Sequence, residues 1–312
     1  IELAGLNAFA PATATHADRL VFSRQYSDID VFTWQPGSAG EPLVASTFAD
    51  SDAAFAPNGR QIAFSSARDG KVAEIWLAES DGSRVRRLVP GPGRWQTSPQ
   101  WSPDGTRIAF DSLDSDGRFH VWTTDSKGGR LRRLTTDAGD QRFPTWSQDG
   151  RWIYYRLDDG GRCDIWKMSA TGGSAARLTH SGNAIWGHET PDGKRFVYQT
   201  KADPVGASGC DQVGTGALLV TSLEGGEPST LVDCAAMNGV AIGPAGIYYV
   251  ACYDSSNKLN VLNPSSGETT YLASLNGLSP GSRMAISPDG TRILYSNQRW
   301  MGVDVYMIDH FR

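Results

Sequence analysis

One phrase recurs along this chain, and it limits the possible folds more than any other feature. Clear copies read Ser-Pro-Asp-Gly-Thr-Arg, then two apolar residues and an aromatic one. The aromatic residue that ends each copy, including the looser copies, is Phe22, Phe64, Phe110, Tyr155, Tyr198, Tyr249 or Tyr295. These positions are 42, 46, 45, 43, 51 and 46 residues apart. Such a period fits one four-stranded blade of a β-propeller.

The phrase has the chemistry of a tight turn between two strands. Proline suits the second position of a type I turn, and glycine permits a positive φ at its end. A third β-rich segment follows each phrase, with Trp76, Trp122 and Trp166 at one shared position, where core packing is the expected role. A fourth segment follows in six of the seven repeats and reads Arg-Arg-Leu-Thr in the third. The pattern therefore predicts an all-β fold.

Seven anchors predict a seven-bladed propeller of four-stranded blades that occupies residues 1–312 as a single domain. The seventh repeat has a third strand at 303–306 and no fourth strand. Residues 1–3 precede the first inner strand, at 6–12, as each fourth segment precedes the next blade. We expect this N-terminal strand to complete the last blade and close the ring, because closure removes exposed sheet edges.

With its Ser-Pro-Asp-Gly-x-Arg-Ile-Ala-Phe phrase, the chain resembles the TolB-like propellers. It resembles most the C-terminal propellers of bacterial winged-helix transcriptional regulators of the CadC-like type. The segments that carry this second resemblance are 163–173, 246–250 and the ending 304–312. The resemblance implies a sensory module whose DNA-binding domain lies outside this chain.

Charge and hydropathy argue against two classes of partner. The net charge is −5, and the basic runs are no longer than pairs such as Arg86-Arg87 and Arg132-Arg133. We therefore expect no nucleic-acid surface. No apolar stretch approaches the ~18 residues that span a bilayer, so we expect no membrane insertion of this chain. Because it opens with Ile1 and shows no signal-peptide pattern, we expect a processed product or a piece of a longer protein.

No nucleophile elbow is expected, because a Gly-x-Ser-x-Gly turn of that kind lies on an α/β sheet and no helical domain is expected here. The sequence also has no His-Glu-x-x-His, Cys-x-x-Cys or glycine-rich phosphate loop. We therefore expect no catalytic residues, no cofactor and no metal. His188 is interpreted as a polar residue on an inner strand, with metal ligation as the alternative. The acidic segment 111–117 resembles part of a calcium loop, but it falls where a hairpin must turn.

The four cysteines bear on the cellular compartment. The blade scheme places all four near one face in adjoining blades, and Cys210 with Cys234 is the favoured pair; independent buried thiols are the alternative. If disulfides form, we expect an extracytoplasmic location, as the soluble part of a membrane-tethered protein. Otherwise the chain would be cytoplasmic.

A ligand site is expected where the inner strands begin, around the mouth of the central channel. The residues predicted to ring this mouth are Asp52, Trp95, Gln96, Arg142, Trp186, Asn238 and Arg283. Aromatic faces beside two arginines and an aspartate suit a small polar ligand or the acidic tail of a partner protein. The alternative is a mouth that holds only water.

Three functions remain open on this evidence. The first is a sensory or protein-interaction module of a larger regulator. The second is a free periplasmic scaffold of the TolB type, and the third is a propeller lyase with a channel metal or the non-catalytic half of a peptidase. The fold alone does not choose among them.

Overall fold

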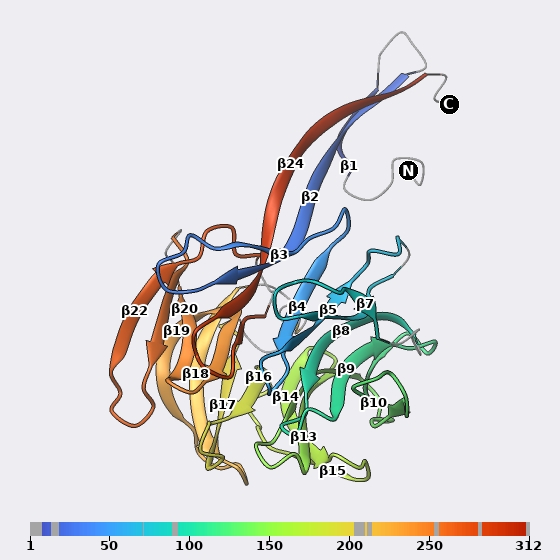
Figure 1. Ribbon diagram of the computed structural model, residues 1–312. Coiled ribbons are helices and arrows are strands. Elements are labelled where there is room, and N and C mark those ends of the chain that lie inside the picture. Colours follow the sequence, from blue (N-terminus) through green and yellow to red (C-terminus); the bar gives the residue numbers. More distant parts are fainter. Residues whose placement is uncertain are drawn as a thin grey trace.

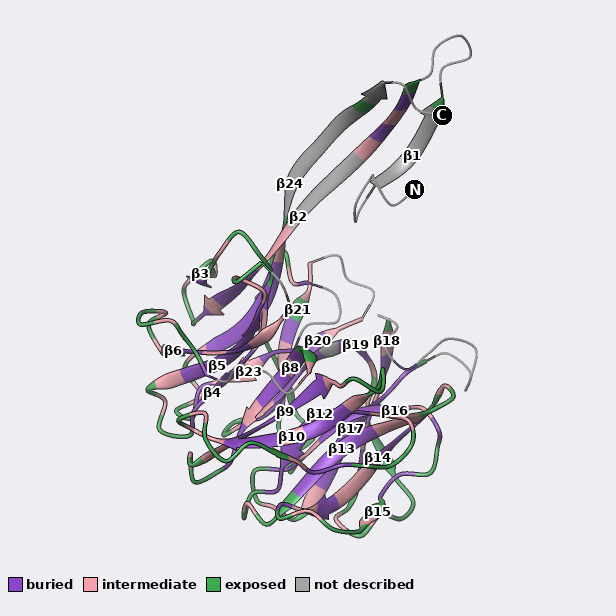
Figure 2. Ribbon diagram, turned by 90° about the vertical axis from the view of Figure 1, so that its right-hand side faces the viewer, coloured by how far each residue is buried: buried purple, intermediate pink, exposed green. Residues whose placement is uncertain are grey.

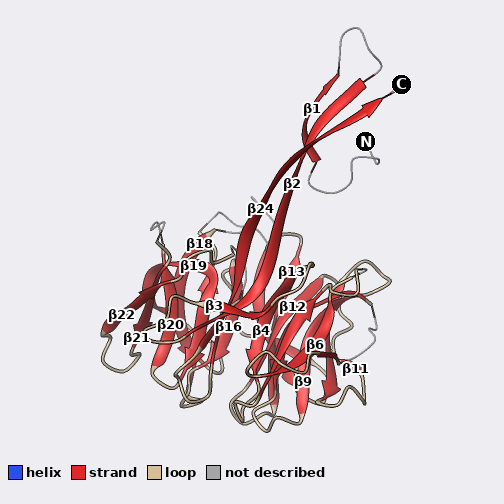
Figure 3. Ribbon diagram, turned by 45° about the horizontal axis from the view of Figure 1, so that its top comes forward, coloured by secondary structure: helices blue, strands red, loops and turns tan. Residues whose placement is uncertain are grey.

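The computed structural model describes residues 8–13, 19–70, 72–88, 93–202, 210, 214–252, 256–279 and 283–309. Every regular element in these ranges is a β-strand (Figure 3). No helix suited to crossing a membrane occurs in them. The prediction of an all-β fold is confirmed.

The strands form four-stranded antiparallel blades, numbered here in chain order. Blade 1 contains β4 (Asp50–Phe55), β5 (Gln61–Ser66), β6 (Glu74–Glu79) and β7 (Arg86–Arg87). Blade 2 contains β8 (Arg94–Trp101), β9 (Arg107–Leu113), β10 (Phe119–Asp125) and β11 (Arg132–Arg133). Blade 3 contains β12 (Asp140–Trp146), β13 (Trp152–Asp159), β14 (Arg162–Ser169) and β15 (Ala175–Arg177).

Blades 4 and 5 share one long strand. Blade 4 contains β16 (Ala184–Glu189), β17 (Arg195–Thr200), β18 (Thr215–Ser222) and the first part of β19 (Ser229–Gly243). The end of β19 then pairs with β20 (Gly246–Ala251), which continues into β21 (Lys258–Leu262) and β22 (Thr269–Ser274) as blade 5. The seven-stranded sheet is therefore two blades joined through β19.

Blade 6 is assembled from both ends of the chain. Its inner strands are β23 (Ala285–Ile286) and the start of β24 (Ile293–Asp309), and its outer strands are the end of β2 (Arg19–Trp34) and β3 (Glu41–Val44). From Ser27 opposite Trp300, the register of β2 and β24 runs without a shift to Trp34 opposite Ile293. The ring therefore closes through two strands from each end of the chain.

This closure corrects the predicted blade count. The described residues form six blades, because the first and seventh repeats contribute two strands each to the same sheet. The segment around 29–34 and Leu43 has the features of third and fourth strands, as predicted, but these strands complete the last repeat. The proposed closing strand at residues 1–3 lies outside the described residues.

The remaining parts of β2 and β24 continue beyond the propeller as a paired arm (Figure 1). A further strand, β1 (Ala8–Thr13), pairs with β2 in this arm. The described part of the predicted first inner strand at 6–12, which is residues 8–12, and the predicted third strand at 303–306 both fall here, outside the ring. Both segments were predicted in the wrong place. The reason is that β2 is longer than one blade strand, so the anchor Phe22 of the first repeat lies in the arm, opposite Tyr306.

The core is divided among the junctions between neighbouring blades. Six hydrophobic clusters of buried residues occur, one at each junction around the ring. At the junction of blades 6 and 1, for example, Val31 and Leu294 share a cluster with Ile62 and Phe64. Figure 2 shows this burial along the strands of the propeller body. Each blade is thus stabilised by both of its neighbours.

The recurring phrase also joins neighbouring blades. Arg107 of blade 2 donates hydrogen bonds from Nη1 to the carbonyl of Ala170, at 3.2 Å, and from Nη2 to that of Gly150, at 3.4 Å, both in blade 3. Its guanidinium also lies 4.5 Å from the ring centroid of Trp146. In the same way, Arg292 of blade 6 donates to the Ser80 carbonyl of blade 1 at 2.7 Å. The arginine of the phrase therefore binds the next blade.

Proline and glycine of the phrase meet across the same junctions. A Cβ added to Gly105 or Gly150 would lie 3.7 Å from Pro57 or 3.6 Å from Pro103, respectively, each the proline of the preceding blade. Both glycines have positive φ, 69° and 68°, which other residues adopt only at a cost. The turns under the ring thus contact one another in succession.

Two disulfides occur, Cys163–Cys210 and Cys234–Cys252, so the predicted Cys210–Cys234 pair is wrong. The reason lies in β19, which runs on through Cys234 instead of ending before it. Because Ala235 pairs with Ala251, the register brings Cys234 opposite Cys252. The four thiols do lie in adjoining blades, 3 to 5.

The interblade role of the phrase can be tested at Arg107. We predict that Arg107→Met lowers the free energy of unfolding by about 1–2 kcal/mol, because two charge-assisted hydrogen bonds and a cation–π contact are lost. Urea unfolding followed by tryptophan fluorescence measures this change. Arg60→Met, at an exposed residue of the matching turn in blade 1, serves as control and should stay within about 0.5 kcal/mol of the parent. Equal losses in both variants would contradict the assignment.

Candidate functional site

The inner strands are bulged at one level of the ring. Register shifts occur between Ser51 and Ala54 in β4, between Thr97 and Gln100 in β8, and between Arg142 and Thr145 in β12. A residue with positive φ sits in each bulge: Asp52 (53°), Ser98 (55°) and Phe143 (59°). Bulges redirect side chains, and such backbone strain is concentrated at functional sites.

The bulge level opens into the central channel. A cavity of about 100 Å³ is lined by residues of all six inner strands. They include Gln100, Thr145, Trp186, His188, Ala241 and Arg283. Asp52, Ser98 and Phe143 each precede a residue that lines this cavity by two positions. This level of the ring is called the mouth below.

Phe143 is the centre of a cluster of three arginines at this mouth. The guanidinium carbons of Arg156 and Arg283 each lie 4.6 Å from its ring centroid, and that of Arg142 lies 4.9 Å away. Arg142 is also 3.9 Å from the centroid of Phe119. Aromatic faces attract cations, so the rings hold three like charges together.

Two carboxylates partly balance these charges. Asp111 accepts hydrogen bonds from the Thr97 hydroxyl and, at 2.8 Å, from the Phe143 amide, and its Oδ2 lies 3.9 Å from Nε of Arg142. Asp52 accepts a long hydrogen bond, 3.5 Å, from the Arg283 amide. Among the described residues, the carboxylates of Asp52 and Asp111 thus lie close to the guanidinium groups of the mouth.

Arg283 is the most costly of these charges to bury. It is 5% exposed, and Nε, Nη1 and Nη2 all lack a hydrogen-bond partner among the described residues. Burial lowers the pKa of Arg283 to about 10, against the opposing effect of Asp52 and Asp111. Burial likewise raises the pKa of Asp52, and Arg283 partly offsets this. A buried cation with unused donors is suited to bind a ligand that accepts hydrogen bonds.

The predicted ring is partly assembled in the structure. Asp52, Arg142 and Arg283 meet around the mouth, and Trp186 lies 5.9 Å from the guanidinium of Arg283. By contrast, Trp95 is 54% exposed and contributes nothing to this cluster.

Two further predicted positions have other outcomes. Gln96 is buried and serves as a structural bridge, because its Oε1 accepts the Ile75 amide at 3.1 Å in blade 1. Asn238 lies on β19, and its side chain is outside the described part of the structure.

Sequence reasoning missed Asp111 and Arg156, although a signal for them exists. A polar residue directly follows the anchor aromatic in five blades, and all five are buried. These residues are Ser65, Asp111, Arg156, Gln199 and Ser296. They come from the second strand of each blade, whereas the prediction considered only the first.

The two alternative metal sites can be compared with the geometry. His188 lies on β16 and lines the cavity, with Nδ1 2.8 Å from the Glu189 carbonyl, and burial lowers its pKa. In the acidic segment, Asp111 faces the mouth, whereas Asp114 and Gly117 form the turn through a 3.1 Å backbone hydrogen bond. Asp111 therefore binds the Phe143 amide, whereas Asp114 and Asp116 both lie against Arg133.

Among the described residues, one group brings three metal-ligating atoms within 4.8 Å of one another, namely Asp158, Cys163 and Cys210. Both sulfurs of that group are joined in a disulfide. This group therefore offers one carboxylate and no free thiolate.

Comparisons with known proteins agree with the propeller fold. The family described as TolB beta propeller domain matches residues 91–231. A search of curated proteins finds no significant match. Among solved structures, a putative TolB from Agrobacterium tumefaciens has 18% sequence identity and a TM-score of 0.69, over 88% of this chain and 99% of that one.

Two other solved structures show how widely the fold is used. TolB from Acinetobacter baumannii has 18% identity and a TM-score of 0.60, over 81% of this chain and 64% of that one. An oligogalacturonate lyase in complex with manganese has 13% identity and a TM-score of 0.56, over 85% of this chain and 77% of that one. The molecule is an all-β propeller, and its architecture is TolB-like.

The cost of the buried charges at the mouth can be measured. We predict that the double variant Asp52→Asn/Arg283→Met is more stable than the parent, with a free energy of unfolding about 1 kcal/mol higher, because two poorly paired buried charges are removed. Chemical denaturation at neutral pH is the measurement. Arg156→Met should instead lose about 2 kcal/mol, because Arg156 is 1% exposed and donates to the Cys210 carbonyl at 3.0 Å. A destabilised double variant would show that Arg283 is structural.

Proposed function

We propose that this chain is a non-catalytic binding propeller whose channel mouth takes an anionic group of a partner, such as the acidic tail of a protein. The observation that carries the proposal is the buried Arg283, with its unused donors, beside Arg142 and two aromatic rings. A carboxylate can accept two parallel hydrogen bonds from one guanidinium, which fits these donors.

The arrangement also selects for the sign of the ligand. A cation would approach the buried guanidinium of Arg283 and would be repelled by it. A neutral apolar ligand would leave the donors of Arg283 without partners, at a cost of about 1–3 kcal/mol. An anion supplies acceptors for these donors.

The propeller serves, on this proposal, as the sensory or interaction module of a CadC-like regulator. The segments 163–173, 246–250 and 304–312 support this context by resemblance. A free TolB-like scaffold is the second candidate, and the TolB-like fold favours it. The coding sequence upstream of Ile1 distinguishes them, since a winged helix indicates the regulator and a signal peptide the scaffold.

The two disulfides support an extracytoplasmic location in either context. Structural disulfides persist in oxidising compartments and are rare in the cytosol. A propeller lyase is the contrasting candidate, because one lyase of this fold was solved with manganese. If metal analysis of the purified protein finds a bound metal ion, that result would favour the lyase over a protein that only binds.

The binding proposal is tested with a fluorescein-labelled hexaglutamate peptide that has a free carboxyl terminus. We predict saturable binding by anisotropy that weakens as salt is added. Arg142→Ala should weaken it by about tenfold or more, because one charge-assisted contact is removed. Trp186→Ala should weaken it as well, because Arg283 loses a neighbouring ring.

A matched variant and a matched peptide control the experiment. Arg60→Ala removes an exposed arginine in a turn at the opposite end of blade 1 and should leave the affinity unchanged. A hexalysine peptide should not bind. If Arg142→Ala and Trp186→Ala both bind the acidic peptide like the parent, the mouth is not the site.

A further inference from the structure

Three consecutive blades repeat one polar contact between their third and fourth strands. In blade 3, Asp164 pairs with Arg177 at 2.5 Å, and the Arg177 Nε donates to the Thr179 carbonyl at 2.9 Å. In blade 1, Glu74 pairs with Arg87 at 3.1 Å. A fixed carboxylate thus anchors the arginine of the fourth strand.

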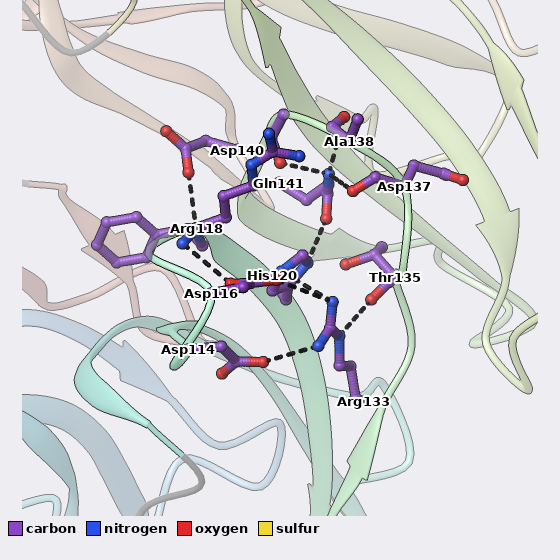
Figure 4. Close-up of polar contacts among 12 residues, drawn as sticks. Asp114, Asp116, Arg118, His120, Arg133, Thr135, Asp137, Ala138, Asp140 and Gln141 are labelled. Carbon is purple, nitrogen blue, oxygen red and sulfur yellow. Dashed lines mark hydrogen bonds and ion pairs between the residues drawn. The ribbon is translucent and has the colours of Figure 1, made fainter.

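In blade 2 a histidine occupies the carboxylate position. His120 on β10 faces Arg133 on β11, with its Nε2 2.8 Å from Nη2 (Figure 4). The rest of the contact is retained, since Arg133 Nε donates to the Thr135 carbonyl at 2.8 Å, just as Arg177 does to Thr179. His120 is 1% exposed, so its hydrogen bonds are made within the protein.

The partners of His120 demand two different protonation states. Gln141 Nε2 donates to the carbonyls of Asp137 and Gly139, at 2.9 and 2.6 Å, so its Oε1 must face His120 Nδ1, at 2.6 Å. Nδ1 therefore carries a proton and donates to Gln141. At Nε2, however, Arg133 can only donate, whereas the carboxylate of Asp116, at 2.9 Å, can only accept.

We propose that His120 is a proton-operated switch between Arg133 and Asp116. The neutral ring, with its proton on Nδ1, accepts a hydrogen bond from Arg133. Uptake of a proton from solvent at Nε2 turns that atom into a donor, which then binds Asp116 and releases Nη2 of Arg133. Imidazole is the side chain whose charge ordinarily changes near neutral pH, which a carboxylate at the same position does not do.

Among the charged side chains of the described residues, Asp116 and Arg133 contact the ring. Asp114, in the same turn as Asp116 between β9 and β10, pairs with Arg133 at 3.2 Å. From the segment that enters β12, Asp137 offers its backbone carbonyl to Gln141, and the Asp140 carboxylate accepts the Phe119 amide. When the ring releases it, the Arg133 guanidinium therefore keeps a carboxylate partner, so the exchange needs no unpaired charge.

The switch is adjacent to the channel mouth along two strands. Phe119, which precedes His120, lies against Arg142, and Gln141, which binds His120, precedes Arg142. The Phe119 amide is also held by Asp140 at 2.8 Å. Proton uptake therefore adds a positive charge beside Phe119 and Gln141, the two residues that connect His120 to Arg142. This inference goes beyond the proposed function and stands whether or not an acidic ligand binds there.

The test is an NMR titration of the histidine ring protons of the whole chain between about pH 5 and 8, with His120 assigned from His120→Asn. Asp116→Asn should move the His120 midpoint to lower pH, because the acceptor of the protonated state is removed. Arg133→Gln should move it to higher pH, because the donor to the neutral state is removed. Each shift should be at least about half a pH unit.

Opposite shifts distinguish a switch from a merely structural histidine. Arg132→Gln changes the exposed neighbour on β11 and should leave the midpoint in place. Shifts in the same direction, no shift in either variant, or a ring that does not titrate in the folded protein would each overturn the proposal.

A second variant gives blade 2 the residue that blade 3 has at this position. In the parent, the amide shifts of Phe119 and Gln141 should follow the ring titration. In His120→Asp this step should disappear over the same pH range, while the fold is retained, as Asp164 is tolerated in blade 3. An unchanged step in the amide shifts of this variant would place its origin in another group and contradict the switch.

Discussion

The rest of the structure depends on the contact between one blade and the next. A single four-stranded sheet exposes two apolar faces and cannot be stable alone, so each blade needs a neighbour on both sides. Here the junction consists of a hydrophobic cluster, together with a proline, a glycine and an arginine supplied by the turn phrase. The phrase recurs because the junction recurs. It forms the turn within its own blade and also contacts the next blade.

This explains what could and could not be predicted from the sequence. The period revealed the blades, because every junction requires the same residues at the same spacing. The blade count was overestimated because residues 29–34 look like a third strand regardless of which end of the chain supplies the first two. At the mouth, Asp52 and Arg283 were predictable from position. The bulge that places Phe143 between three arginines depends on a positive φ, which no local pattern at Phe143 indicates.

The mouth differs from the junctions in how its arginine donors are paired. Arg107 and Arg177 donate to carbonyls or carboxylates, whereas Arg283 keeps its donors unused. Three bulges in neighbouring blades hold their residues in unfavourable backbone conformations at the same level. Both features reduce stability, and they coincide around one cavity. Two destabilising features at the same place, with no gain in packing from either, are the physical reason to propose a binding role for the mouth.

The two-plus-two closure has a mechanical consequence. β2 and β24 are antiparallel partners from Arg19 opposite Asp309 to Trp34 opposite Ile293, so their outer ends leave the propeller side by side. Tension that draws these ends apart would load the ladder one hydrogen-bonded pair at a time, in the manner of a zip. The pairs of the arm would separate first and those of blade 6 last. The hydrogen-bonded pairs of the arm must therefore separate before the force reaches blade 6 and opens the propeller ring.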